Sequence, residues 1–233
     1  MSVVADSAVS VYFAAGISML STTDMFREAM RHVESRYKSG GCSKVRVQTF
    51  FPYGTLDHLP TKSGQLRFIA GQAFTVGRDI YRQPKDTVGG RTLYREIRND
   101  YDTENGGSIV LIGHSGGGIA SYKAAQLLGE EGYPVMKVFM VGSPQIAICP
   151  SCRDKVFAIE HGGRFGDWIS RSAFHWFRPA KVRARIPIRG GHRHYFCNQS
   201  KDENNVSNMD KVMDFIWGWI QGEPGIVYNG IKT

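Results

Sequence analysis

The sequence predicts an α/β protein built around a mostly parallel sheet, and three observations support this. Six short apolar runs recur along the chain. Most of them lack the strict alternation of a half-exposed strand, as expected for strands buried on both faces of a parallel sheet. Helical patterns separate these runs, and such an alternation produces parallel strands joined by right-handed crossovers. The predicted strands span residues 10–14, 45–49, 108–112, 136–141, 155–159 and 183–188.

Amphipathic stripes predict the helices between and after these strands. The last stripe follows Ser207, and Asp210 three residues later makes a pattern that resembles a capping box. Ser21, Thr22 and Thr23 are candidate caps for the first helix, because their hydroxyls can accept a bond from a free backbone N–H. The three clearest stripes are Phe26-Ala29-Met30-Val33, Ile119-Tyr122-Ala125-Leu128 and Met209-Val212-Met213-Ile216-Ile220.

The interval from residue 51 to residue 107 is longer than one crossover needs, with 57 residues between consecutive strands. It holds two helical patterns, on either side of a turn-rich segment at 83–90. The first pattern is Leu66-Ile69-Ala73-Val76 and the second is Leu93-Ile97-Tyr101. No repeat, low-complexity tract or linker interrupts the chain, so we expect one domain over residues 1–233.

The composition is that of an ordinary globular protein. Of 233 residues, 42% are hydrophobic and 21% are charged. These values exclude an intrinsically disordered chain, a collagen or a coiled coil. No apolar run approaches the roughly 18 residues that a membrane-spanning helix needs. Four cysteines in a chain of this length do not indicate a disulfide scaffold.

The charge is strongly positive, because 29 Lys and Arg residues face 21 Asp and Glu residues and leave a formal charge of +8. Such an excess can attract an anionic membrane surface, an acidic substrate or nucleic acid. We do not expect nucleic acid, since no recognisable binding module is present. The first cation is Arg27, so the basic start of a signal peptide is missing and we expect a cytoplasmic protein.

The strongest motif is Gly113-His114-Ser115-Gly116-Gly117, which follows a predicted strand and precedes a predicted helix. In that setting a Gly-x-Ser-x-Gly pattern indicates a nucleophile elbow, a sharp turn that exposes the serine hydroxyl at the edge of a sheet. The start of the helix offers free N–H groups to a developing oxyanion. A phosphate-binding loop is disfavoured, because no Gly-Lys-Ser/Thr ending is present.

This motif and its setting resemble those of the α/β-hydrolase family, and in particular its small lipase- and esterase-like members. The resemblance covers most of the chain. It implies a minimal α/β-hydrolase fold with about six mostly parallel strands, helices on both faces and no large cap domain. It also implies a triad in the chain order serine, acid, base.

Asp167 is the candidate acid, since it follows the strand at 155–159 in a Gly-Asp-Trp-Ile segment that resembles the family's acid position. A carboxylate there would accept a bond from histidine Nδ1–H and stabilise the imidazolium. Asp154 and Glu160 are alternatives. Asp154 precedes its strand, and Glu160 has a longer side chain nearer the strand end.

His192 is the candidate base, in the loop after the last predicted strand. Two glycines precede it, and its His-x-x-Tyr-Phe pattern resembles the base segment of lipase-like hydrolases. His194 is the competitor two residues later. We expect His114 to pack within the elbow or to line the pocket. The remaining histidines, His32, His58, His161 and His175, fit less well because they precede the last strand.

The oxyanion hole needs two N–H donors, and the resemblance implies where they lie. One is the backbone N–H of Gly116, directly after the nucleophile. The other belongs to the loop after the first strand, where we nominate Ile17, with Gly16 as the alternative. Family members often carry a histidine before this glycine, and this chain has Ala15 there. The match is therefore partial, although the donor itself is a backbone group.

Together these residues predict a serine hydrolase that cleaves carboxylic esters through an acyl-enzyme on Ser115, without metal or cofactor. Thioester hydrolysis or acyl transfer on the same site is the first alternative. A non-catalytic or anionic-ligand-binding protein that keeps the fold is the alternative from another class. The sequence does not choose the acyl group, the alcohol or the oligomeric state.

Three further features of the sequence carry weaker signals. Cys149 and Cys152 have the Cys-x-x-Cys spacing, but two further zinc ligands and a thioredoxin-like setting are missing, so we interpret them as a turn. Aromatic clusters at 50–53 and 174–177 fit the core or the walls of a pocket. A basic stretch without acids fits a solvated face or an anion-attracting surface, and its cations are Arg178, Lys181, Arg183, Arg185, Arg189 and Arg193.

Overall fold

The protein is described by a computed structural model that covers residues 8–17, 25–56, 61–163, 167–171 and 180–222. Its centre is a six-stranded sheet in the order β2-β1-β3-β4-β5-β6, and each neighbouring pair of strands is parallel. All six strands lie within two residues of the predicted ends. Their bounds are β1 (Ala8–Ala14), β2 (Lys44–Phe50), β3 (Ser108–His114), β4 (Val135–Val141), β5 (Val156–His161) and β6 (Val182–Ile186).

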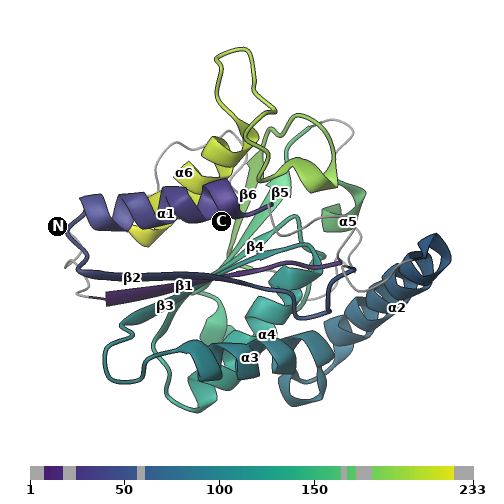
Figure 1. Ribbon diagram of the computed structural model, residues 1–233, viewed down its shortest axis with the longest axis horizontal. Coiled ribbons are helices and arrows are strands. Elements are labelled where there is room, and N and C mark those ends of the chain that lie inside the picture. Colours follow the sequence, from purple (N-terminus) through teal and green to yellow (C-terminus); the bar gives the residue numbers. More distant parts are fainter. Residues whose placement is uncertain (1–7, 18–24, 57–60, 164–166, 172–179, 223–233) are drawn as a thin grey trace.

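Helices cover both faces of the sheet (Figure 1). On one face, α1 and α6 pack over a hydrophobic cluster centred on β1 and β3 side chains such as Phe13 and Ile112. On the other face, α3 and α4 pack over a second cluster that includes Tyr12 and Leu111. Because adjacent residues of one strand serve opposite clusters, the central strands β1, β3 and β4 are largely apolar. The edge strands β2 and β6 carry charged side chains. The helices are α1 (Arg27–Ser39), α2 (Lys62–Tyr81), α3 (Val88–Asp100), α4 (Gly116–Glu130), α5 (Trp168–Arg171) and α6 (Asn208–Ile220), with short 3-10 turns η2 (Pro84–Asp86), η3 (Pro150–Cys152) and η4 (His192–His194).

The strand order places a topological switch point between β1 and β3. From β1 the chain goes to β2 on one side, and it then returns to β3 on the other side of β1. Ligands of open parallel sheets bind at the carboxyl ends of the strands where the order reverses. Ala15 and Gly16 follow β1 at this edge, and Ser115 follows β3.

The parallel sheet, its two helical layers and the strand–serine–helix turn after β3 form a minimal α/β-hydrolase fold. Within the ranges given above, no separate cap domain covers the carboxyl edge of the sheet. None of the helices in these ranges is long and apolar enough to cross a membrane.

Helix capping at α6 follows the sequence. At α6, Ser207 Oγ accepts from Asp210 N at 3.0 Å, and Ser207 N donates to Asp210 Oδ2 at 3.3 Å, which confirms the predicted capping box. At α1, the N-cap position is Phe26, and its side chain makes no capping hydrogen bond. The hydroxyl cap expected from residues 21–23 stays a prediction. Those three residues lie outside the described ranges.

The long interval before β3 contains the two predicted helices, but only part of the predicted stripe of the first is buried: Val76 is buried, whereas Leu66 and Ala73 are exposed. The buried residues of α2 are Gln72, Val76 and Asp79, whereas Leu66 is 69% exposed. Gln72 Nε2 donates to the carbonyl oxygens of Tyr53 and Gly54, both at 2.9 Å. Polar side chains therefore occupy the inner face because they bind the backbone of neighbouring loops.

Candidate active site

Ser115 sits at a sharp turn between β3 and α4, with φ 57° and ψ −129°. L-residues avoid this region, and holding one there costs about 1–3 kcal/mol. The turn is fixed at both sides, since Ser115 N donates to Val141 O at 2.9 Å and Gly118 N donates to Ser115 O at 3.0 Å. Ser115 is the N-cap of α4, so its hydroxyl stands beside the positive end of a 15-residue helix.

Glycines let the chain approach the serine turn from β1. A Cβ atom on Gly16 would lie 2.5 Å from Gly116 N and 3.0 Å from Ser115 Cβ. A Cβ atom on Gly117 would lie 2.0 Å from Ala14 O. The loop after β1 therefore packs directly on the backbone of the turn. This brings the two predicted donor segments together, with Gly116 on one side and the Gly16–Ile17 loop on the other.

Asp167 and His192 form a close pair, with 2.5 Å between Asp167 Oδ2 and His192 Nδ1. Asp167 precedes α5 and its side chain is fully buried, while His192 begins η4 after β6. Tyr195 donates its hydroxyl to the same Oδ2 at 3.2 Å, and Ile169 N donates to Oδ1 at 2.9 Å. The carboxylate is therefore held by three donors, one of them the imidazole.

These donors decide the protonation of Asp167. Burial raises the pKa of its carboxyl group, but the hydrogen bond and charge of His192 and the N–H of Ile169 oppose burial, and the pKa lies below the usual value. Burial and the neighbouring Asp167 charge raise the pKa of Tyr195, so its hydroxyl stays a donor. An ionised carboxylate facing Nδ1 suits an imidazole that must accept a proton at Nε2.

His114 connects the base loop to the serine turn. Its ring centroid lies 4.9 Å from that of His192, and its Nε2–H donates to His192 O at 2.9 Å. Burial, with a further effect from His192, lowers the pKa of His114 to about 3. The ring next to the serine is therefore neutral, and it fixes the backbone of His192 by a direct hydrogen bond.

Asn208, at the start of α6, holds the same loop from the other side. It is fully buried, and its Nδ2 donates to Arg189 O at 2.7 Å and to His194 O at 3.0 Å. Its Oδ1 accepts from Arg189 N at 2.9 Å. One amide thus binds both ends of the segment that carries His192. Sequence reasoning missed this residue and the role of Tyr195, although Tyr195 stands in the quoted His-x-x-Tyr-Phe pattern.

The alternatives weighed for the acid have other partners. Glu160 accepts from Arg183 at 2.6 and 2.9 Å and from Gln145 Nε2 at 3.0 Å. Asp154 is exposed and pairs with Lys181 at 3.0 Å.

The alternatives weighed for the base also lie apart from the Asp167 pair. His194 is exposed, and its Nδ1 accepts from Gly191 N at 3.1 Å. His161 binds the backbone of Gly163 and Gly190. His58 and His175 lie outside the described ranges.

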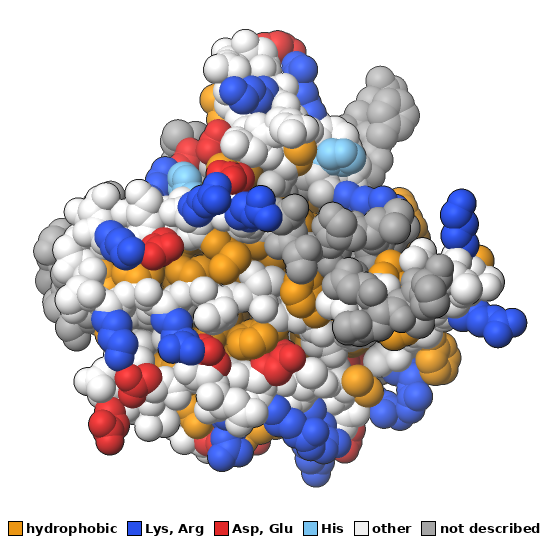
Figure 2. All heavy atoms as spheres, in the orientation of Figure 1, with side chains coloured by type: hydrophobic (Ala, Val, Ile, Leu, Met, Phe, Trp, Pro, Cys, Tyr) orange, Lys and Arg blue, Asp and Glu red, His pale blue; other side chains and the backbone are white. Residues whose placement is uncertain are grey.

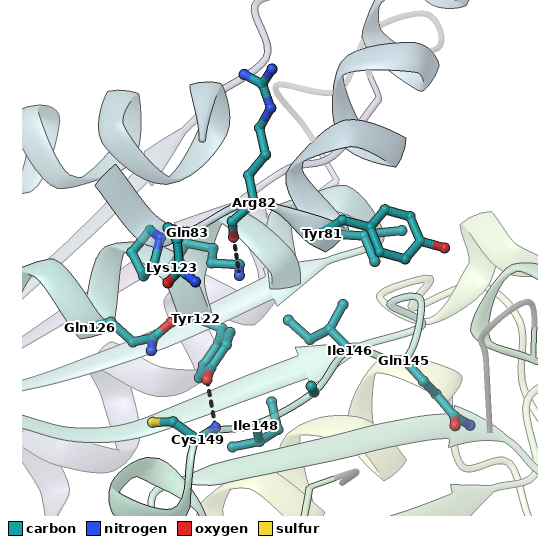
Figure 3. Close-up of a pocket in the computed structure, with 13 residues that line it drawn as sticks. Tyr81, Arg82, Gln83, Tyr122, Lys123, Gln126, Gln145, Ile146, Ile148 and Cys149 are labelled. Atoms are coloured by element: carbon teal, nitrogen blue, oxygen red, sulfur yellow. Dashed lines mark hydrogen bonds between the residues drawn. The ribbon is translucent and has the colours of Figure 1, made fainter. Parts of the chain in front are cut away.

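A cavity of about 560 Å³ opens beside α4, and it contains none of the three predicted triad residues. Figure 3 shows Lys123 and Tyr122 of α4 facing the end of α2 and the loop after β4. Lys123 Nζ donates to Arg82 O at 2.7 Å, and Cys149 N donates to the Tyr122 hydroxyl at 2.8 Å. The cavity therefore lies along the nucleophile helix but away from its first turn.

Cys152 lies on the short turn η3, and Cys149 directly precedes that turn and lines this cavity, as the interpretation of a turn implied. Both thiols are free, and the hydroxyl of Ser151 lies 3.3 Å from Cys149 Sγ. In the described part of the chain, no group of three or more His, Cys, Asp or Glu residues is placed to hold a metal ion.

Comparison with known proteins does not assign the chain to a family. No family model and no curated protein matches the chain. Among solved structures, a Trichoderma reesei cutinase in complex with a C11Y4 phosphonate inhibitor resembles it at 17% sequence identity and a TM-score of 0.38. The match covers 71% of this chain and 66% of the cutinase chain. This chain therefore spans just under two-thirds of the length of the cutinase. A likeness at this level adds nothing to the geometry described above.

Proposed function

We propose that this protein is a serine hydrolase that cleaves carboxylic esters through an acyl-enzyme on Ser115. Asp167 and His192 would complete the triad, and the backbone N–H groups of Gly116 and Ile17 would form the oxyanion hole. The observation that carries the proposal is the contact between His192 Nδ1 and the buried Asp167 carboxylate, in a loop bonded to the residue before the strained serine.

The chemistry follows from these positions. His192 Nε2 would take the hydroxyl proton as Ser115 Oγ attacks the ester carbonyl, and Asp167 would stabilise the imidazolium without taking its proton. The tetrahedral oxyanion would be held by two N–H donors, each worth about 2.7–4 kcal/mol in the transition state. His192 would then protonate the departing alcohol and leave an acyl group on Ser115. Water would release the acid by the same route in reverse.

Hydrolysis of a short p-nitrophenyl ester tests this proposal. Ser115→Ala should lower kcat by about 10⁶, and Asp167→Asn by about 10⁴, because an amide at 167 favours the wrong imidazole tautomer. His192→Gln should approach the Ser115→Ala value. His194→Gln is the matched control, since it removes an exposed imidazole two residues away and should keep wild-type activity.

The competing outcomes are distinct. If His194→Gln abolishes hydrolysis while His192→Gln does not, the assignment of the base is wrong. If the wild-type protein hydrolyses thioesters much faster than oxygen esters of the same acyl group, the mechanism stands and the substrate class changes. If folded wild-type protein hydrolyses neither, the protein is not a hydrolase of this kind.

A further inference from the structure

Helix α2 exposes large hydrophobic side chains to an unusual degree. Five large hydrophobic side chains are exposed within the described ranges, and three of them lie on this helix. Leu66 is 69%, Phe74 66% and Tyr81 65% exposed. Single exposed apolar residues are normal, but a row of them on one element marks an interaction surface.

These three residues share one face of α2. At about 100° per residue, Phe74 and Tyr81 lie within roughly 80° of Leu66 around the helix axis. Ala70, Ala73 and Gly77 fall in or beside the same arc. The stripe runs for about 22 Å along the helix, at 1.5 Å per residue. We call this face, from Leu66 to Tyr81, the α2 stripe.

The α2 stripe lies opposite the face that packs on the protein. The buried residues Gln72, Val76 and Asp79 centre roughly 200° away from it around the axis. The inner face binds loop backbone through polar groups, as described above. Packing among the residues that the structure describes therefore gives no reason for apolar residues on the outer face.

Positive charge flanks the α2 stripe on both sides. Lys62, Arg67 and Arg78 are exposed, and the Arg78 guanidinium lies 5.5 Å from the centre of the Phe74 ring. The one acid of the helix, Asp79, is buried and accepts from the N–H groups that begin α3. In Figure 2, blue cationic side chains with orange hydrophobic atoms between them mark the far right of the molecule, where Figure 1 places α2.

The basic stretch before the proposed base is different, because four of its described cations have acidic partners. Arg183 and Arg185 approach Glu160, and Arg189 pairs with Glu203 at 3.3 Å. Lys181 likewise pairs with Asp154. Within the described ranges, no carboxylate pairs with the three cations of α2. An anionic surface would therefore meet uncompensated charge at α2 rather than at this stretch.

We propose that α2 docks lengthwise on an anionic lipid surface, with the α2 stripe in the boundary between headgroups and acyl chains. Amphipathic helices bind such surfaces by this combination of apolar anchors and flanking cations. The α2 stripe offers no hydrogen-bonding side chain except the Tyr81 hydroxyl. Such a surface suits the hydrocarbon of a lipid better than the polar surface of an acidic protein. Trp168, 73% exposed beside Asp167, adds an aromatic side chain at the same edge of the sheet.

Docking there would bring the lipid surface to the proposed active site. Val76 on the inner face of α2 packs on the serine turn, since a Cβ atom on Gly116 would lie 2.7 Å from Val76 Cγ2. The same helix thus contacts the turn with one face and the lipid with the other. The inference goes beyond the proposed function, and binding can be measured without any hydrolysis.

Co-sedimentation of the full chain with lipid vesicles tests the inference. We expect binding to vesicles of equal parts phosphatidylglycerol and phosphatidylcholine, and much weaker binding to pure phosphatidylcholine or at high salt. Arg67→Glu with Arg78→Glu should weaken binding by about thirtyfold or more, because each cation near an anionic surface contributes about a fivefold factor. Leu66→Ser with Phe74→Ser should weaken it by about tenfold or more.

Charge-matched substitution on another helix is the control. Arg91→Glu with Arg95→Glu changes the net charge by the same amount at two exposed positions of α3, and it should leave binding within about twofold. Circular dichroism should show that all variants fold, since every substituted side chain is exposed.

Three results would overturn the inference. The first is a wild-type protein that ignores anionic vesicles. The second is an equal loss of binding in the α2 and α3 charge variants. The third is a wild-type dimer that becomes monomeric with Leu66→Ser and Phe74→Ser, since a second copy of the chain would then occupy the α2 stripe.

Discussion

The buried histidine beside the serine makes a quantitative prediction about acid stability. His114 is 6% exposed, and burial lowers its pKa from 6.5 to about 3. His192 and Asp167 both interact electrostatically with it, and Tyr195 packs within ring contact. In the unfolded chain the same imidazole takes up a proton below about pH 6.5. In the folded state His114 stays neutral at that pH. Its contribution to the free energy of unfolding is therefore complete above about pH 6.5 and is lost as the pH falls.

The magnitude follows from the two pKa values. Between about pH 7 and about pH 5, protonation of the unfolded histidine alone lowers the free energy of unfolding by about 2 kcal/mol. The loss continues at about 1.4 kcal/mol per pH unit and stops near the folded pKa of about 3. Other groups also titrate in this range, so the wild type must be compared with a variant in which only His114 is replaced.

Urea unfolding of the wild type and of His114→Gln at both pH values measures this difference. The amide can still donate toward His192 O, but it does not titrate. The wild type should lose about 2 kcal/mol more than the variant between the two pH values. Above about pH 8 the gap between the two proteins should stay constant. Equal pH dependence of both proteins would refute the assignment of a buried neutral imidazole.

Three further substitutions test the geometry of the site. Ser115→Gly should be more stable than Ser115→Ala by about 1 kcal/mol in urea unfolding, because glycine adopts the observed backbone angles without strain; equal stability would argue against strain. Gly16→Ala should lower kcat by about 100-fold, because its Cβ atom would collide with Gly116 N and displace the proposed oxyanion hole; unchanged kinetics would remove that loop from the site. Asn208→Ala should lower the free energy of unfolding by about 1–3 kcal/mol, because three backbone groups of the base loop lose their partner. In the same variant, kcat should fall by a larger factor than KM rises. A loss of stability with normal kcat would mean that Asn208 supports the fold without positioning His192.

The sheet was predictable from the sequence because its signal is local. Central strands such as β1 and β3 are short apolar runs, because burial on both faces leaves little room for polar residues. The inner face of α2 was not predictable by the same rule. Gln72 and Asp79 are buried there because each satisfies backbone groups of a distant loop or helix start, and hydrophobic periodicity carries no information about such partners.

In the candidate site, too, local features could be predicted from the sequence and long-range contacts could not. The serine turn is visible as a motif of consecutive residues, so its strained conformation could be anticipated. The pairing of residues 167 and 192 spans 25 positions and was inferred only through a family resemblance. The hydrogen bond from His114 to the base loop spans 78 positions and has no sequence signature. The tertiary fold alone brings these groups together.

Covalent labelling tests the central claim most directly. A fluorophosphonate probe followed by peptide mass spectrometry should place one adduct on Ser115 in the wild-type protein. Asp167→Asn and His192→Gln should label far more slowly, while His194→Gln should label at the wild-type rate. An adduct on another residue, or labelling at full rate in folded Ser115→Ala, would contradict the account.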